Sequence, residues 1–185
     1  MGERTLERTI RRACTGDPRA FGRLYDEYAD RIYAFVRSRV SPAEDAEDVT
    51  ATVFMKAYEA IGSYDDRGLP FSAWLFRIAR NAIVDHYRRS ERVPTPTEDL
   101  SEADAEVSGP EQAAVLAADR ETLRAAVRQL TDEQAAVIAL RFWWDSSLEE
   151  TALALGKNTN AIKALQHRAV RSLARILGEA GDDEV

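Results

Sequence analysis

Apolar residues recur every three or four positions along most of the chain, with polar residues between them. This spacing places the apolar residues on one side of an α-helix, and the alternation typical of strands is nearly absent. The first such helix is expected to open at Asp17-Pro18, because proline at the first helical position marks a start. Its apolar positions are Phe21, Leu24, Tyr25, Tyr28, Ile32, Phe35, Val36 and Val40. The pattern therefore predicts an all-α protein.

Two more helices complete a first predicted domain, residues 1–91. Ser41-Pro42-Ala43-Glu44 matches a capping box, in which the side chains at both ends accept hydrogen bonds from free backbone amides. The helix behind it is expected to end at Gly62, and Ser72 is expected to cap the next one. The predicted inward residues of these two helices are Val49, Val53, Ala57, Ile61, Leu75, Ile78, Ala79 and Ala82.

A second helical domain is predicted over residues 110–185. It follows a linker, residues 92–109, in which prolines and acids replace the helical repeat, as is typical of a flexible tether. Capping boxes at Thr131 and Ser147 mark two helix starts in this domain. The predicted helices are 110–130, 132–143, 148–155 and 158–177.

Charge is distributed unevenly along the chain, although its formal net charge is -7. Residues 156–177 contain five basic residues and no acids, and residues 77–92 also carry net positive charge. Residues 94–111 contain six acids and no bases. Two basic helical stretches thus flank an acidic one, which keeps a nucleic-acid partner possible despite the overall sign.

Composition also excludes several classes of protein. No apolar run approaches the roughly 20 residues of a membrane span, and the amino terminus lacks the apolar stretch of a signal peptide, so we expect a cytoplasmic protein without membrane contact of its own. Cys14 is the only cysteine, which rules out an intrachain disulfide. His86 and His167 lie far apart in sequence, so we expect no metal and no cofactor.

Residues 131–177 have the spacing of a helix-turn-helix that presents a basic helix to DNA. Such helices cross closely, which requires a small residue, a turn glycine and an apolar anchor, and Ala152, Gly156 and Ile162 meet these needs. A bundle helix with a solvated basic face is the alternative. The predicted DNA contacts are Asn158, Thr159, Asn160, Lys163, Ala164, His167, Arg168, Arg171 and Arg175, the last three suited to phosphates.

Residues 130–142, followed by Leu148-Glu-Glu-Thr-Ala and by Ile162-Lys163 leading to His167-Arg168-Ala169, resemble the fourth region of extracytoplasmic-function sigma factors of bacterial RNA polymerase. The resemblance implies that this domain binds the minus-thirty-five promoter element and docks on the flap of the polymerase β subunit.

Residues 45–57 and 71–89 resemble the second region of the same family. Within the first segment, acidic and polar residues form an outward stripe at helical spacing, which suits a basic protein partner. The resemblance implies that the stripe grips the coiled coil of the polymerase β′ clamp, whereas a solvated helix face is the alternative. The predicted polymerase-binding residues are Asp45, Glu47, Asp48, Thr52, Met55 and Glu59.

The helix that contains Asn81 presents an aromatic ring, an amide and several guanidiniums on one side. This chemistry suits opened DNA, in which an unstacked base must be held and its strand bound through phosphates. By resemblance, this helix and the loop 63–71 recognise and melt the minus-ten element, and Asn81 helps to hold a flipped base. Trp74 alternatively belongs to the core. The predicted residues are Tyr64, Asp65, Arg67, Phe71, Trp74, Arg77, Arg80, Asn81 and Arg88.

The leading prediction is a sigma factor that binds core RNA polymerase, recognises both promoter elements and opens the promoter, and the resemblance implies control by an anti-sigma factor. The acidic linker either threads towards the RNA exit path or is a soluble tether. A stand-alone helix-turn-helix regulator is the alternative function, but it leaves the acidic stripe and the Asn81 helix without a role. An enzyme is disfavoured because the sequence offers no catalytic triad, phosphate-binding glycine loop or metal cluster.

Overall fold

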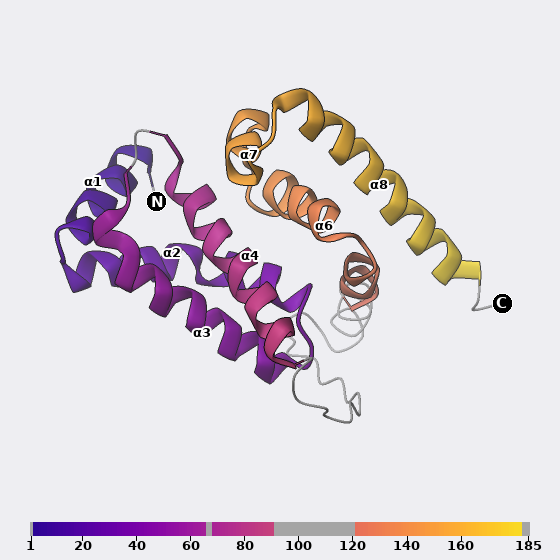
Figure 1. The fold of residues 1–185 in the computed structure, drawn as a ribbon, viewed down its shortest axis with the longest axis horizontal. Coiled ribbons are helices and arrows are strands. Elements are labelled where there is room, and N and C mark those ends of the chain that lie inside the picture. The colour runs from indigo at the N-terminus through magenta and orange to yellow at the C-terminus, as the bar shows by residue number, and fades with distance from the viewer. Residues whose placement is uncertain (1, 66–67, 91–120, 183–185) are drawn as a thin grey trace, which may run out of the picture.

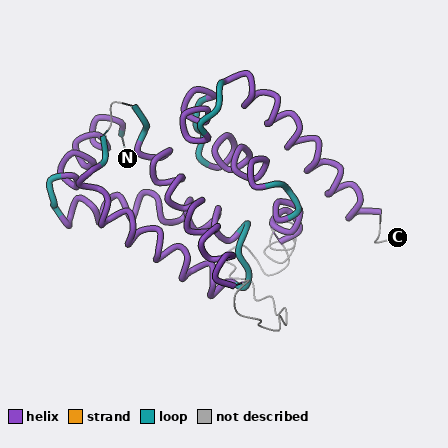
Figure 2. The backbone as a smooth tube through the Cα atoms, viewed as in Figure 1, coloured by secondary structure: helices purple, strands orange, loops and turns teal. Residues whose placement is uncertain are grey.

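The computed structural model describes residues 2–65, 68–90 and 121–182, which form helices and turns without a strand (Figures 1 and 2). The predicted all-α class is confirmed. The predicted linker 92–109 and the start of the helix predicted from Pro110 lie outside the described residues.

The elements are α1 (Glu3–Cys14), α2 (Pro18–Arg37), α3 (Ala43–Ala60), the 3-10 turn η1 (Ile61–Ser63), α4 (Phe71–Ser90), a helical segment over 121–128, α6 (Asp132–Ile138), the π-helical turn η2 (Ala139–Trp143), α7 (Leu148–Leu155) and α8 (Thr159–Asp182).

Helices α1–α4 form an amino-terminal bundle around the predicted apolar residues. The Asp17 side chain caps α2 by accepting hydrogen bonds from the amides of Arg19 (3.0 Å) and Ala20 (3.2 Å). Tyr25 departs from the prediction, because its side chain is exposed, although its ring lies against that of the core residue Phe54. The largest fully buried side chains of this bundle are Leu24, Ile32, Val36, Val40, Val53, Leu75 and Phe76.

Helix α1 was not predicted from the pattern, because it is short and most of its residues are charged or polar. Its buried side consists of Thr9 and Ala13, with Leu6 and Ile10 packed at the edge of the core. The spacing of Leu6, Ile10 and Ala13 is the signal that could have revealed it. The amino-terminal segment thus adds a fourth helix to the bundle.

The caps predicted at Ser41 and Ser72 are wrong. Helix α3 begins at Ala43 with Pro42 as its cap, and no side chain caps it, so Ser41 lies one position too early. Helix α4 already begins at Phe71, because the Trp74 amide donates to the Pro70 oxygen (2.9 Å). Ser72 is therefore inside the helix instead of at its cap.

Both capping boxes of the carboxy-terminal bundle (121–128 and α6–α8) are confirmed. The Thr131 hydroxyl accepts from the Gln134 amide at 3.3 Å, and the Gln134 side chain accepts from the Thr131 amide at 3.1 Å. Ser147 and Glu150 form the same reciprocal pair at 3.0 and 2.7 Å. These boxes satisfy backbone amides that have no partner inside the helix, and they set where α6 and α7 begin.

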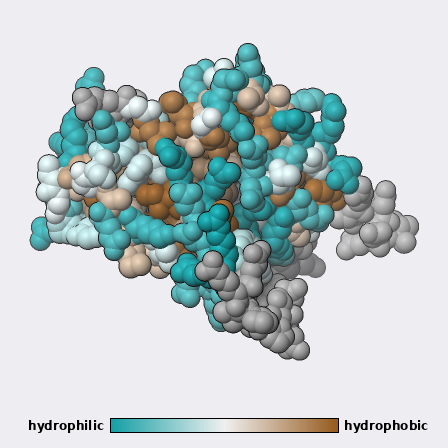
Figure 3. Space-filling view, viewed as in Figure 1, coloured by the Kyte–Doolittle hydropathy of each residue, from teal (hydrophilic) through white to brown (hydrophobic). Residues whose placement is uncertain are grey.

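The hydrophobic core of the amino-terminal bundle extends into the carboxy-terminal bundle, which also has a second core of its own. Trp144 is 5% exposed and lies against the rings of Tyr28 and Phe76 in the amino-terminal bundle, at centroid distances of 6.0 and 5.6 Å. Burial raises the pKa of Tyr28 to about 12. Ala154 of α7 also belongs to this core, and α7 packs on α4. Figure 3 shows apolar residues gathered towards the centre of one face, surrounded by hydrophilic ones.

None of the helices in the described ranges is long and apolar enough to cross a membrane.

Replacing Gly156 with alanine is expected to lower the free energy of unfolding by about 1 kcal/mol, because Gly156 ends α7 in the left-handed conformation (φ 63°), which disfavours a side chain. Thermal and urea denaturation would measure this loss. Gly22→Ala in α2 is the matched control, since Gly22 is helical and its added Cβ would meet open space. A Gly156→Ala protein as stable as Gly22→Ala would contradict the argument.

Candidate nucleic-acid interface

The helix-turn-helix predicted around Gly156 is present in the structure. Ala152 and Ile162 are buried where α7 and α8 cross, and Ile162 is fully inaccessible. Gly156 reverses the chain between them, and the Lys157 amide donates to the Ala152 oxygen at 2.9 Å. The Asn158 side chain accepts a hydrogen bond from the Ala161 amide at 2.8 Å, so Asn158 caps α8. These contacts orient α8 relative to α7.

The outer side of α8 carries the predicted DNA-facing residues. Thr159 is half-buried at the helix start, whereas the others are exposed. Lys157 instead pairs with Glu133 (2.8 Å), so its charge is partly neutralised within the protein. The exposed residues of this surface, here called the α8 face, are Asn160, Lys163, Ala164, His167, Arg168, Arg171 and Arg175.

Arg141 is a positioning residue that sequence reasoning missed. It extends from η2, donates to the Gln166 side chain on α8 at 3.2 Å, and also donates to the backbone oxygen of Ser146. It thereby joins the turn before α7 to the inner edge of α8. No sequence motif marked it, because the partners lie 5 and 25 residues away.

On α4 the predicted minus-ten residues divide into two groups. Arg77, Asn81 and Arg88 are exposed on one side of the helix. Arg80 is half-buried and lies near Glu133 of the other bundle, where it helps to lower the pKa of Glu133 after the larger effect of the hydrogen bond from Lys157. The exposed group leaves an amide and two guanidiniums available to a ligand.

The predicted aromatic residues near the loop pack on one another. Trp74 is half-buried, and its ring lies 5.2 Å from that of Tyr64 and 5.3 Å from that of Phe71. Phe71 is only 4% exposed, and the Tyr64 hydroxyl donates to the Leu69 oxygen at 2.8 Å. The packing supports the core alternative for Trp74. These rings support the loop, whereas Asp65 is exposed and Arg67 lies outside the described residues.

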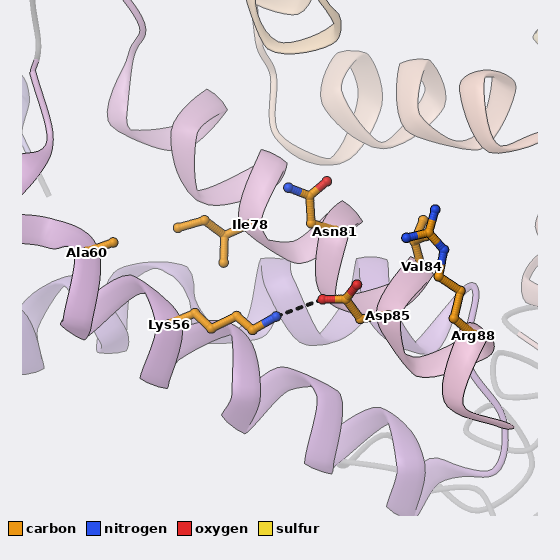
Figure 4. Close-up of a pocket in the computed structure, with 7 residues that line it drawn as sticks. All are labelled: Lys56, Ala60, Ile78, Asn81, Val84, Asp85 and Arg88. Carbon is orange, nitrogen blue, oxygen red and sulfur yellow. Dashed lines mark hydrogen bonds and ion pairs between the residues drawn. The ribbon is translucent and has the colours of Figure 1, made fainter. Parts of the chain in front are cut away.

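A groove of about 430 Å³ lies between α3 and α4 beside Asn81 (Figure 4). Lys56 extends from α3 towards α4, and its ammonium pairs with the Asp85 carboxylate at 2.9 Å. Here this cavity is called the Asn81 groove. It is lined by Lys56, Ala60, Ile78, Asn81, Val84, Asp85 and Arg88.

Sequence reasoning did not select Lys56 and Asp85 as site residues, since 29 positions separate them. The hydrogen bond from Lys56 is the main reason that the pKa of Asp85 is lowered. A lowered folded-state pKa makes the pair stabilising above the ordinary pKa of a carboxyl, near pH 4, and this contribution is lost as the pH falls below it. Both side chains are more than two-fifths exposed, so the contribution is small.

The acidic stripe follows the exposed side of α3. Glu47, Asp48, Met55 and Glu59 are exposed, Asp45 and Thr52 are half-buried, and the Thr52 hydroxyl donates to the Asp48 oxygen at 2.9 Å. His86 and Arg89 of α4 border the stripe across a shallow groove of about 460 Å³. The His86 imidazole lies 3.7 Å from the Asp45 carboxylate. The stripe therefore presents carboxylates with an exposed apolar methionine among them.

Among the residues that the structure describes, no group of three His, Cys, Asp or Glu side chains is arranged to hold a metal ion.

Comparison with known proteins matches both halves of the chain to families. Residues 24–93 match the model described as Sigma-70 region 2, and residues 126–175 match the one described as Sigma-70, region 4. The chain is 41% identical over 169 residues to the ECF RNA polymerase sigma factor BldN of Streptomyces coelicolor. The aligned region covers 91% of this chain but only 64% of BldN. The chain is also 33% identical over 187 residues to the ECF RNA polymerase sigma factor SigD of Mycobacterium tuberculosis. That aligned region covers 98% of this chain and 88% of SigD.

The fold is also similar to a solved structure, that of CnrH in complex with the cytosolic domain of CnrY. The TM-score is 0.69 and the sequence identity 27%, over 92% of this chain and 96% of that chain.

Proposed function

The chain belongs to the family of extracytoplasmic-function RNA polymerase sigma factors, and on this premise we propose that it binds core RNA polymerase and directs it to promoters. Residues 1–91 and 110–185 are its two working domains, joined by the acidic linker 92–109. It acts in the cytoplasm as a specificity subunit and is not itself a catalyst. The observation that carries the proposal is the pairing of an exposed cationic helix with a separate groove that contains Asn81.

The α8 face is the proposed minus-thirty-five surface. Asn160 and Lys163 lie near the start of α8, where side chains reach base edges when such a helix enters the major groove. Arg168, Arg171 and Arg175 lie further along and contact phosphates. Because Asn158 is occupied as a helix cap, its side chain contributes mainly by orienting α8.

The Asn81 groove is the proposed site for a base of the minus-ten element after it leaves the stack. An amide beside a lysine and a carboxylate supplies both donors and acceptors for the edge of a base, and Ile78 supplies an apolar wall. Arg88 lines the groove, Arg77 lies one turn before Asn81 on the exposed side of α4, and both suit the phosphates of the same strand. Lys56 and Asp85 thereby join Asn81 as proposed recognition residues.

The acidic stripe of α3 is the proposed contact with the β′ clamp, and the carboxy-terminal domain is proposed to dock on the β flap. Carboxylates around an exposed methionine suit a partner that is basic at its rim and apolar at its centre.

Reversing charge in the stripe by Asp48→Arg is expected to weaken binding to core polymerase severalfold, because it removes an attraction and adds a repulsion. Fluorescence anisotropy with labelled protein would measure the affinity. Asp26→Arg is the matched control, since Asp26 is an exposed acid on α2 outside the stripe. If both variants bound core polymerase like the unmodified protein, α3 would not be the contact.

Reconstitution with core polymerase, followed by mapping of transcript start sites, tests the whole function. The expected result is initiation at a defined set of promoters that core polymerase alone does not use. Promoter binding by the free protein, with no transcript when core polymerase is added, would instead identify a stand-alone regulator.

We further propose that an anti-sigma factor holds the protein inactive. The structurally similar CnrH has been solved in complex with the cytosolic domain of a second protein, CnrY, which supports a protein partner for this fold. Co-purification of the tagged chain from its native host under resting and stress conditions would test this. The expected partner is a protein that core polymerase displaces from the tagged chain.

A further inference from the structure

We propose that helix α1 is a further DNA-binding surface, which holds the backbone of the single strand downstream of the minus-ten element through Arg4, Arg8 and Arg11. The inference rests on the proposed function, because it extends the minus-ten site from α4 and its loop to the neighbouring helix. It gives a role to an amino-terminal helix that contains neither minus-ten residues nor the acidic stripe.

The three arginines, here called the α1 row, lie on the outer side of the helix. Residues spaced by four and three positions fall on the same side of an α-helix. Thr9 and Ala13 are buried on the opposite side, and all three arginines are exposed. With a rise of about 1.5 Å per residue, the row extends about 10 Å along the helix axis.

The charges of the α1 row are available to a ligand. Within the described ranges, no carboxylate forms an ion pair with any of the three, not even the exposed Glu7 of the same helix, whereas the adjacent Arg12 pairs with Asp17 at 2.6 Å. A guanidinium binds phosphate through parallel N–H donors and keeps its charge at neutral pH. An exposed row of guanidiniums without ion-pair partners therefore suits a run of phosphates.

The position of the α1 row identifies the DNA strand that it meets. The last turn of α1 lies beside η1 and the loop before α4 (Figure 1). Arg11 and Thr15 line a groove of about 520 Å³ there, together with Ser63 and Asp65 at the start of the loop. The other end of the loop leads into α4, which carries Asn81. A strand that leaves the Asn81 groove along this loop therefore comes next to α1.

Opening of a promoter makes this strand single-stranded. The strands separate from the minus-ten element towards the start site, where the template base must reach the polymerase, whereas the DNA towards the minus-thirty-five element stays paired. Successive phosphates of a stacked strand are about 3.4 Å apart along its axis, so the row spans about three of them. The Asp65 carboxylate repels phosphate, so the backbone lies over the arginines, outside the groove. Phosphate contacts of this kind position a strand without reading its sequence.

The test uses the full chain bound to core polymerase and a promoter fragment that is duplex upstream and single-stranded through the minus-ten element. The single strand either ends there or continues downstream for several nucleotides. The variant is Arg4→Ala with Arg8→Ala and Arg11→Ala, in which alanine preserves the helix because it has the highest helix propensity. The matched control removes the same charge from exposed positions of α2, by Arg19→Ala with Arg23→Ala and Arg31→Ala.

The extension is expected to tighten binding severalfold for the unmodified protein and the control, and hardly at all for the α1 variant. The slope of log affinity against log salt concentration on the extended DNA should fall by about 0.7 for each lost phosphate contact, or about 2 in total. Methylphosphonate linkages in the extension, which carry no charge, should abolish the gain of the unmodified protein and leave the α1 variant unchanged.

Two outcomes would overturn the proposal. An α1 variant that keeps the full gain, or a control that loses as much of it, would mean that the row does not hold the strand. An α1 variant that is weakened equally on both fragments would place α1 against a protein surface instead. Failure of the unmodified protein to increase the binding of core polymerase to the shorter fragment would overturn the proposed function, and this measurement is separate from the gain.

Discussion

Replacing Lys163 and Arg171 together with alanine is expected to weaken binding to minus-thirty-five DNA by roughly tenfold to a hundredfold at low salt. Both side chains are exposed on the α8 face, so neither substitution leaves a cavity or a buried group without a partner. Each phosphate contact that is lost should also reduce the slope of log affinity against log salt concentration by about 0.9. Binding to core polymerase should be unchanged, because the acidic stripe is on the other bundle and the two substituted residues belong to the α8 face, which is proposed to contact DNA and not the β flap.

The measurement is a salt titration of affinity on a short duplex, using the unmodified chain and the double variant. Arg19→Ala with Arg23→Ala is the matched control, since it removes the same charge from exposed positions of α2. An equal loss in the control would mean that net charge, and not the α8 face, sets the affinity. A weaker complex with an unaltered salt slope would argue against phosphate contact and favour base-edge contact alone.

Replacing Asn81 with alanine is expected to slow promoter opening by roughly tenfold to a hundredfold, with a much smaller effect on the closed complex. The amide is exposed at the edge of its groove, and a base held there exchanges its partner in the duplex for hydrogen bonds with the protein. Without the amide, the flipped base loses those hydrogen bonds with the protein. The contacts that form the closed complex on duplex DNA persist.

Permanganate reactivity of unpaired thymines would follow opening, and a gel-shift assay would follow the closed complex. Asn81→Asp distinguishes the effect of side-chain size from that of hydrogen-bond donation, because it keeps the size of the side chain but removes the amide donors. It should therefore open promoters as poorly as Asn81→Ala. Normal permanganate reactivity in either variant would show that Asn81 does not hold a base.

Much of the fold could be predicted from local signals. Thr131 and Ser147 begin their helices as predicted, because a capping box needs only four consecutive residues and its hydrogen bonds close within them. Ser41 and Ser72 carry a similar local signal but do not cap their helices. Helix α3 starts one residue later than predicted and α4 two residues earlier, and in each the backbone oxygen of a proline, Pro42 or Pro70, accepts the first helical hydrogen bond. Local patterns therefore place a helix more reliably than they place its first residue.

The candidate site was predictable only in part. The α8 face could be predicted, because its exposed residues lie on one helix and follow its period. The ion pair between Lys56 and Asp85 could not be predicted, because it exists only after α3 and α4 have packed together. Phe71 and Trp74 carry the right chemistry for an unstacked base, but burial among neighbouring rings occupies both.

The sequence by itself determined most of the helices, the capped starts of α6 and α7, and the separation of two basic stretches by an acidic segment. Each of these follows from residues within a few positions of one another, where periodicity and hydrogen bonding act locally. Only the tertiary structure decided that Trp144 packs into the core of the other bundle, that the Arg39 guanidinium donates to the backbone oxygens of Val127, Arg128 and Leu130, and that Asn81 borders a groove. Those features depend on surfaces that meet only after the helices pack, and the energy gained there comes from desolvation and from contacts between residues far apart in the chain.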